Sequence, residues 1–157
     1  MSEVGNLSIV RRQFESWNDH DWAELTRDVA DGFLMDSDTN VSPIVGRDGL
    51  RQYARVMNVA FPDLHFDLIE IFGDGDMVTS TWIASATHRG DFRGMPATGR
   101  RIEIHGCTVT RFRAGRIARQ HTYWDVHTLR RQMGAPSIRP PLSIDREMSL
   151  GEAGRDA

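Results

Sequence analysis

The sequence contains no lysine, because all 19 residues counted as Lys+Arg are arginine. Schiff-base aldol chemistry and the attachment of pyridoxal phosphate both require a lysine amine. Both activities are therefore excluded for these 157 residues. The arginine bias itself is typical of a GC-rich coding genome.

Cysteine is nearly absent as well. Cys107 is the only one, so it has no partner for an intrachain disulfide, and a chain of this kind suits a reducing compartment. The N-terminus lacks an apolar signal-peptide core, and no apolar run approaches the roughly 20 residues of a membrane span. We therefore expect a cytoplasmic protein with no membrane partner.

The sequence also lacks the motifs of most cofactor and metal sites. It has no glycine-rich phosphate loop, no Cys-x-x-Cys and no His-Glu-x-x-His. His105, His121 and His127 are close in sequence, but without the spacing of three convergent metal ligands. The formal net charge is −3, with both signs interspersed, which argues against a nucleic-acid surface. We expect no cofactor, no metal and no nucleic acid.

What is present is a succession of helical patterns followed by long strand patterns. Apolar residues recur with helical spacing over residues 7–19 and 22–29, and a third helix opens at Arg47. A short strand is predicted over 32–35, and longer strands over 64–72, 77–89, 101–113 and 116–123, joined by hairpin-type turns. A last helix covers 126–133 and ends at Gly134.

This order predicts an α+β fold in which a curved antiparallel sheet, covered by N-terminal helices, forms a cone with a hollow mouth. A cavity of that kind is the default binding site of a small domain. The domain is predicted over residues 1–135. Residues 136–157 are rich in Pro, Ser, Asp, Arg and Gly, which predicts an extended or disordered tail.

Asp125 is the first candidate for chemistry, because it follows the last strand and begins the last helix. A carboxylate there can be a helix N-cap, or it can be a proton-transfer group at the cavity mouth, with a pKa raised by partial burial. His105 is the second candidate. It shares a strand face with Cys107, and we expect it near Asp125 if that face looks inward.

The cavity wall is predicted from aromatic and histidine side chains. Each of these residues has an alternative interpretation as ordinary core packing; alternation, for example, places His121 on one face with Ile117 and Tyr123. The six candidates are Trp17, Phe33, Tyr53, Trp82, His88 and His121.

Several motifs in order resemble the SnoaL-like polyketide cyclases of the nuclear-transport-factor-2-like superfamily. The resemblance extends from about Leu7 to Gly134. It is carried by Phe61-Pro62-Asp63, Thr87 to Phe92, Gly94 to Arg100, Gly115-Arg116-Ile117, Trp124-Asp125 and Gln132-Met133-Gly134.

The resemblance implies a cofactor-independent enzyme that closes a ring of a small aromatic polyketide by an intramolecular aldol reaction. It implies that Asp125 is the acid/base residue, assisted by a histidine on the preceding strand. That histidine is His105, unless Val109 or Arg111 occupies the equivalent position. It also implies a homodimer or homotetramer.

Three alternatives remain open at this stage. The same family includes hydroxylases of polyketide tailoring. An epoxide hydrolase of the limonene type would need an Asp–Arg–Asp relay in the pocket, for which Arg111 or Arg119 could supply the arginine. A non-catalytic module that binds a small molecule would need only the cavity.

Overall fold

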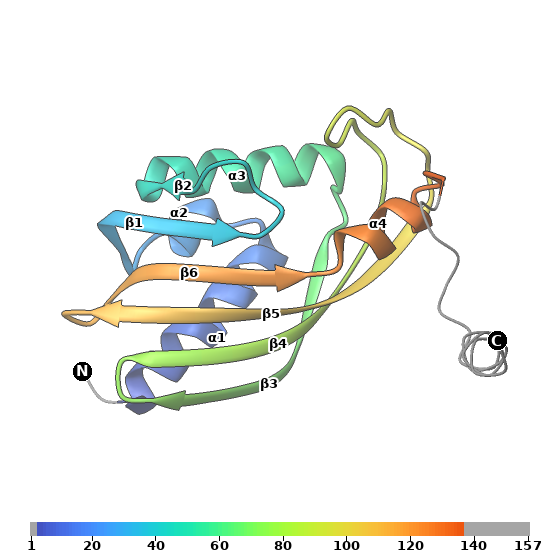
Figure 1. The fold of residues 1–157 in the computed structure, drawn as a ribbon. Helices are drawn as coiled ribbons and strands as arrows, with labels where there is room; N and C mark the ends of the chain where they lie inside the picture. Colours follow the sequence, from blue (N-terminus) through green and yellow to red (C-terminus); the bar gives the residue numbers. More distant parts are fainter. Residues whose placement is uncertain (1–2, 137–157) are drawn as a thin grey trace, which may run out of the picture.

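Six strands form one strongly curved, open sheet in the computed structural model, which describes residues 3–136 (Figure 1). The order across the sheet is β2-β1-β6-β5-β4-β3. The strands are β1 (Val29–Ser37), β2 (Ile44–Val45), β3 (His65–Asp74), β4 (Met77–Thr87), β5 (Arg101–Arg113) and β6 (Arg116–Trp124), and the helices are α1 (Glu3–Asp19), α2 (Trp22–Leu25), α3 (Gly46–Ala60) and α4 (Val126–Gln132).

The predicted α+β architecture with a curved sheet is confirmed. The hairpins that join β3 to β6 are antiparallel, as their turn sequences predict. The sheet is not wholly antiparallel, however, because β1 pairs with β6 in parallel. No hairpin joins these two strands, which are far apart in the chain, so no local turn signal fixes their relative direction.

The long helices cover the concave face of the sheet. Helix α1 packs on β3 and β4, whereas α3 packs on β1 and β2. Asn18 attaches the end of α1 to β3, since its amide donates to the Phe66 carbonyl at 2.9 Å and accepts from the Phe66 N–H at 2.8 Å. These contacts hold the helices over the strands and leave a space between them.

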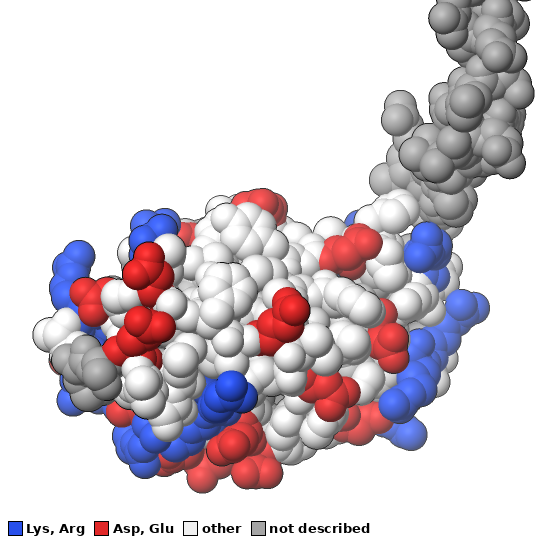
Figure 2. Space-filling view, turned by 90° about the horizontal axis from the view of Figure 1, so that it is seen from below, with Lys and Arg blue, Asp and Glu red and all other residues white. Residues whose placement is uncertain are grey.

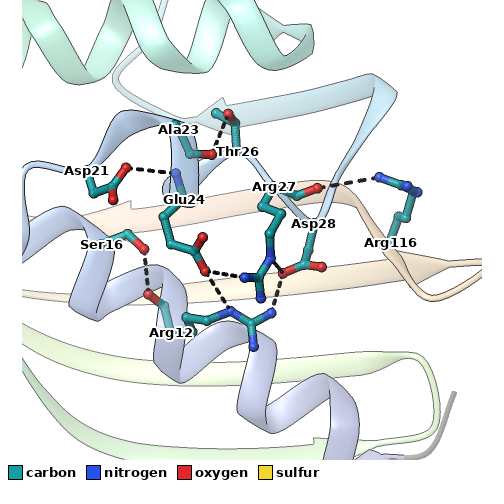
Figure 3. A network of polar contacts seen from close by, with 9 residues as sticks. All are labelled: Arg12, Ser16, Asp21, Ala23, Glu24, Thr26, Arg27, Asp28 and Arg116. Carbon is teal, nitrogen blue, oxygen red and sulfur yellow. Dashed lines mark hydrogen bonds and ion pairs between the residues drawn. The ribbon is translucent and has the colours of Figure 1, made fainter.

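A network of charged side chains fixes the outer side of α1 (Figure 3). The Arg12 guanidinium contacts Glu24 at 3.2 Å and also donates to Asp28, while Arg27 contacts Glu24 at 2.8 Å. Glu24 lies on α2 and Asp28 precedes β1, so the network joins three successive parts of the chain. It sets the rotation of α1 and so determines which of its residues face the sheet.

Two groups of buried apolar residues make up the core. One lies among the helices, β1 and the far ends of the long strands, and includes Phe33 and Leu50. The other lies at the end of the sheet near α4, and includes Phe61 and Trp82. Trp17 of α1 packs against both groups.

Some element boundaries differ from the sequence prediction. Helix α2 ends at Leu25 instead of continuing to residue 29, and Val29 starts β1, which is longer than the predicted short strand. Strand β2 has no counterpart among the predicted strands. The tail predicted for residues 136–157 lies outside the described residues apart from its first position, so it stays a prediction, as does the domain boundary.

Charges of both signs spread over the surface that Figure 2 shows, with uncharged side chains between them. No single-sign patch dominates that face, in agreement with the mixed charge pattern of the sequence. In the described part of the chain, no helix is long and apolar enough to cross a membrane.

Candidate functional site

A cavity lies between the helices and the concave face of the sheet. It encloses about 940 Å³ of atom-free space, its open mouth included. Its lining residues come from three helices, five strands and the turn after α3. The apolar ones are Phe14, Trp17, Met35, Met57, Phe61, Leu64, Phe66, Trp82, Ala84, Ile102, Ile104, Trp124 and Leu129.

Aromatic rings in edge-to-face contact form much of the wall. The ring centroid of Trp17 lies 6.2 Å from that of Tyr53 and 5.7 Å from that of Phe66. Phe66 in turn lies 5.2 Å from Trp82. Such pairs stabilise a fixed arrangement beyond the burial of their area, so this wall is a rigid apolar surface suited to a flat ring system.

A strip of neutral polar side chains crosses the sheet side of the cavity. The Trp82 indole N–H donates to Thr108 Oγ1 at 3.0 Å, and Thr108 and Thr122 share a hydrogen bond of 3.2 Å. Gln120 donates to Gln13 Oε1 at 2.8 Å and to Thr110 Oγ1 at 3.1 Å. All but Thr110 line the cavity. The inner faces of β5 and β6 therefore carry hydrogen-bonding groups without charge.

Tyr53 of α3 adds a phenol to the lining. Burial raises the pKa of Tyr53, and the nearby positive charge of Arg93 offsets only part of that rise. A raised pKa means that the neutral, protonated phenol is favoured. Since no group within residues 3–136 forms a hydrogen bond with its hydroxyl, Tyr53 has a free proton donor.

The cavity is poor in charge. Among the described residues, its lining includes no histidine and no arginine, and one carboxylate, Asp36. Asp36 forms an ion pair with Arg119 at 2.6 Å. The β1–β6 register aligns Met35 with the buried Gln120, whereas Asp36 aligns with His121 on the alternate side. By strand alternation the carboxylate therefore lies on the outer side, with Arg119.

Trp124, a lining residue of the cavity, contacts the end of β1 and the excursion between β4 and β5. The Trp124 indole N–H donates to Ser37 Oγ at 3.2 Å. Arg93 lies over the Trp124 ring, 5.5 Å from its centroid, and donates to the Thr39 carbonyl at 3.0 Å. The exposed Arg93 thus joins this excursion to the end of β6 and to the loop after β1.

Three of the six predicted wall residues line the cavity: Trp17, Tyr53 and Trp82. Phe33 is fully buried in the neighbouring core and is not part of the lining. His88 is also fully buried, and its Nδ1 lies 3.0 Å from Thr98 Oγ1 under the β4–β5 excursion.

His121 lies away from the cavity, with its Nε2 3.2 Å from Asp38 and its ring 4.3 Å from that of Tyr123. The prediction that alternation places it on one face with Ile117 is wrong. A bulge shifts the register of β6 against β5, since Arg111 pairs with Arg119 but Phe112 pairs with Ile117. Because a one-residue shift exchanges the faces, Ile117 is buried and His121 is on the other side.

Asp125 is the N-cap of α4. Its carboxylate accepts from the Thr128 N–H at 2.9 Å and from the Thr128 hydroxyl at 2.6 Å. These bonds lower the pKa of Asp125 and outweigh the small effect of desolvation. Asp125 is exposed and is not among the lining residues. The capping interpretation is thus confirmed, whereas the proton-transfer role stays a prediction.

His105 lies on the outer face of β5, exposed, and the cavity lining does not include it. It pairs across the sheet with Ile83, while the inward Trp82 pairs with Gly106. The condition under which His105 and His88 would share a cavity, that both strand faces look inward, is therefore not met. The structure does not bring Asp125 and His105 together in the cavity.

The polar strip was missed in the sequence prediction, although a signal for it exists. On β5 the apolar residues Ile102, Ile104 and Phe112 occupy even positions, in phase with Thr108 and Thr110. Polar residues in the apolar phase of a strand indicate a polar inner surface. For Gln13, the only signal is its phase on the helix beside Phe14 and Trp17.

Two further chemistries can be compared with this geometry. Arg119 does contact an aspartate, but the pair lies on the outer side, and the lining contains no second carboxylate within the described residues, so the Asp–Arg–Asp relay of an epoxide hydrolase is not formed in the cavity. In the same part of the chain, no three His, Cys, Asp or Glu side chains are grouped so that they could hold a metal ion.

Comparison with known proteins places this geometry among related folds. The family model described as SnoaL-like polyketide cyclase matches residues 8–133. A comparison with curated protein sequences gives no significant match.

Solved structures with the same fold include IdmH of Streptomyces antibioticus, a candidate polyketide cyclase, at 26% identity and a TM-score of 0.71, over 83% of this chain and 99% of that one. AclR of Streptomyces galilaeus, a candidate hydroxylase, has 21% identity and a TM-score of 0.82 over 99% and 97%. A protein of Catenulispora acidiphila with a ketosteroid isomerase-like fold has 16% identity and a TM-score of 0.71 over 85% and 97%.

Proposed function

The chain belongs to the SnoaL-like polyketide cyclase family, and we propose that it binds a neutral polyketide-type ketone in its cavity and promotes ring closure there through the Tyr53 phenol. The observation that supports this most is the neutral chemistry of the cavity wall. Aromatic rings and uncharged hydrogen-bonding groups line it, and Tyr53 offers an unused proton donor. The apolar wall suits a flat, partly aromatic substrate.

In the proposed reaction, the substrate reacts as its enol, the form that a carbon between two carbonyls readily adopts. The enol carbon attacks a second carbonyl of the same molecule, and a carbon–carbon bond forms. The attacked oxygen takes the Tyr53 proton, and the proton of the enol hydroxyl restores the phenol. The protein supplies no strong base in this scheme.

Two physical effects account for the proposed rate acceleration. A folded substrate held with both reacting carbons in contact gains the large advantage of an intramolecular reaction. A phenol with a raised pKa stays protonated at neutral pH, so it can donate to the developing alkoxide in a largely apolar cavity.

The test uses deuterium exchange at the acidic C–H of 2-tetralone in heavy water, followed by proton NMR. A phenol that donates to the ketone oxygen also makes the neighbouring C–H more acidic, so the solvent removes this proton faster. Exchange therefore reports the Tyr53 donor without knowledge of the natural substrate. We expect the wild-type chain to accelerate exchange and Tyr53→Phe to lose at least about tenfold, a part of the roughly 10²–10⁴-fold that acid–base catalysis supplies. Asp125→Asn is the matched comparison, and we expect it to retain the wild-type rate.

The outcomes separate the alternatives. A loss of exchange in Asp125→Asn, with Tyr53→Phe active, would assign proton transfer to Asp125, as the family resemblance implies. Binding of the ketone without any acceleration by the wild type would favour a binding module.

A hydroxylase is the second candidate, because the likeness to AclR covers nearly the full length of both chains. Oxygen consumption with an electron-rich naphthol as substrate distinguishes it from a cyclase. We expect no oxygen uptake above the rate without protein.

A further inference from the structure

Gln13 of α1 is a buried amide with an unused donor in the cavity wall. Its exposed fraction is 8%, and its Nε2 has no hydrogen-bond partner among the described residues. A buried N–H group without a partner destabilises the protein by the free energy lost on leaving water. We propose that the Gln13 amide binds a neutral oxygen atom of the ligand, a ketone or quinone carbonyl.

The orientation of this amide follows from its neighbour. Gln120 donates its Nε2 to Gln13 Oε1 at 2.8 Å and to Thr110 Oγ1 at 3.1 Å. If the Gln13 amide alone were turned over, two NH₂ groups would face each other at that distance without an acceptor between them, so the orientation of each amide depends on that of the other. The oxygen of Gln13 is thus satisfied by the protein, and its NH₂ group remains for a ligand.

The position of Gln13 is fixed from the other side of the helix. The adjacent Arg12 holds α1 to Glu24 and Asp28 on the outer side (Figure 3). Gln13 faces the cavity between the sheet and this network. A donor held in this way loses little conformational freedom when it binds an acceptor.

The uncharged cavity lining determines which kind of ligand oxygen can bind the Gln13 amide. The cavity lining includes no histidine or arginine within the described residues, and its other polar groups are uncharged apart from the outward Asp36. A carboxylate or phosphate would enter without a counter-charge and would lose its hydration. A carbonyl on an apolar ring system fits both the amide and the aromatic wall.

This inference rests on the proposed function, because it names the substrate feature that the cavity recognises. Its test measures ligand binding alone and involves no turnover. The probes are 1-tetralone and tetralin, which have the same ring skeleton and differ in one carbonyl. Calorimetry gives the two dissociation constants, and their ratio is the carbonyl preference. Because both probes bury similar apolar area, the ratio reports the hydrogen bonds to the carbonyl, and its change in the Gln13 variants isolates the share of Gln13.

We expect the wild type to prefer 1-tetralone and Gln13→Leu to reduce that preference by about three- to tenfold, the size of one neutral hydrogen bond. Tetralin should bind the variant at least as well as the wild type. Gln13→Glu, which keeps the shape but offers an acceptor, should lose the preference as well. The control is Gln52→Leu, an exposed glutamine on α3, and it should behave as the wild type.

Retention of the full preference in Gln13→Leu and Gln13→Glu would overturn the inference, and so would a wild type that binds both probes equally or not at all. The proposed function fails separately, if Tyr53→Phe keeps its exchange rate. A loss of preference in the Gln13 variants stands whatever that rate is, because no turnover enters the measurement.

Discussion

The indole of Trp82 occupies the space that a side chain at position 106 would need. A Cβ atom added to Gly106 would lie 2.3 Å from two carbon atoms of the Trp82 ring. The two residues are cross-strand partners on the inner side of β4 and β5. Because position 106 has no side chain, the Trp82 ring reaches the cavity wall and its N–H bonds Thr108.

Gly106→Ala is therefore expected to destabilise the protein by about 1–3 kcal/mol, the usual effect of overpacking a well-filled site. The Trp82 ring is rigid and hydrogen-bonded to Thr108, so it cannot move aside without losing that bond. Thermal or urea unfolding followed by circular dichroism measures the change. Gly32→Ala is the matched control, since nothing lies within 4 Å of a Cβ atom there, and a similar loss in both variants would contradict this explanation.

Asp125 has a structural role that can be measured separately from catalysis. Asp125→Ala removes both bonds to Thr128 and is expected to lower the free energy of unfolding by about 1 kcal/mol, as for other N-caps. Asp125→Asn keeps an oxygen acceptor and should lose less. Urea unfolding at neutral pH compares the two, and equal losses would mean that the charge, and not the cap, is what matters.

The pH dependence of the stability that Asp125 contributes follows from the direction of its pKa shift. The pKa of Asp125 is lowered in the folded protein, chiefly by the Thr128 hydrogen bonds. The unfolded state therefore binds a proton more readily, so the contribution is present above the ordinary aspartate value and is lost as the pH falls through the folded value. The difference in stability between wild type and Asp125→Ala should be constant near neutrality and shrink below about pH 4.

Arg12 connects α1 to α2 and to the start of β1. Arg12→Gln removes its contacts with Glu24 and Asp28, both partly buried, and we expect a loss of about 1 kcal/mol in stability, at the upper end of the range for exposed ion pairs. High salt should reduce the difference. The control is Arg11→Gln, an exposed neighbour, and no difference between the two variants would show that the network does not hold α1.

The Asp36–Arg119 pair tests whether a charge on the outer side affects the cavity. Arg119 is about half exposed, with a side-chain exposure of 55%. We expect Arg119→Gln to change stability by less than about 1 kcal/mol and to leave the affinity for 1-tetralone unchanged. A several-fold loss of affinity, measured by calorimetry, would instead place the Asp36 carboxylate in contact with the ligand.

Strand β5 shows most clearly how much of the site the sequence predicts. Its periodicity correctly groups His105 with Cys107, but does not by itself say which face is inward. The charged residues Arg101, Glu103 and Arg111 share the phase of His105, and this signal was available. On β6 no such signal exists, because the bulge near Ile117 changes the phase in the middle of the strand. A bulge depends on pairing with another strand, so periodicity within one strand cannot locate it.

The sequence by itself determined the strands β3 to β6, their hairpins and the last helix after Asp125, because each depends on residues near one another in the chain. The absence of lysine chemistry and the family resemblance follow directly from the residue identities. Only the tertiary structure decided what the cavity contains. The parallel pairing of β1 with β6 and the bulge in β6 turn Asp36 and His121 outward. The same pairings bring Gln13, 107 positions away in the chain, into contact with Gln120. Contacts over that distance follow from strand pairing and helix packing, which local patterns do not encode.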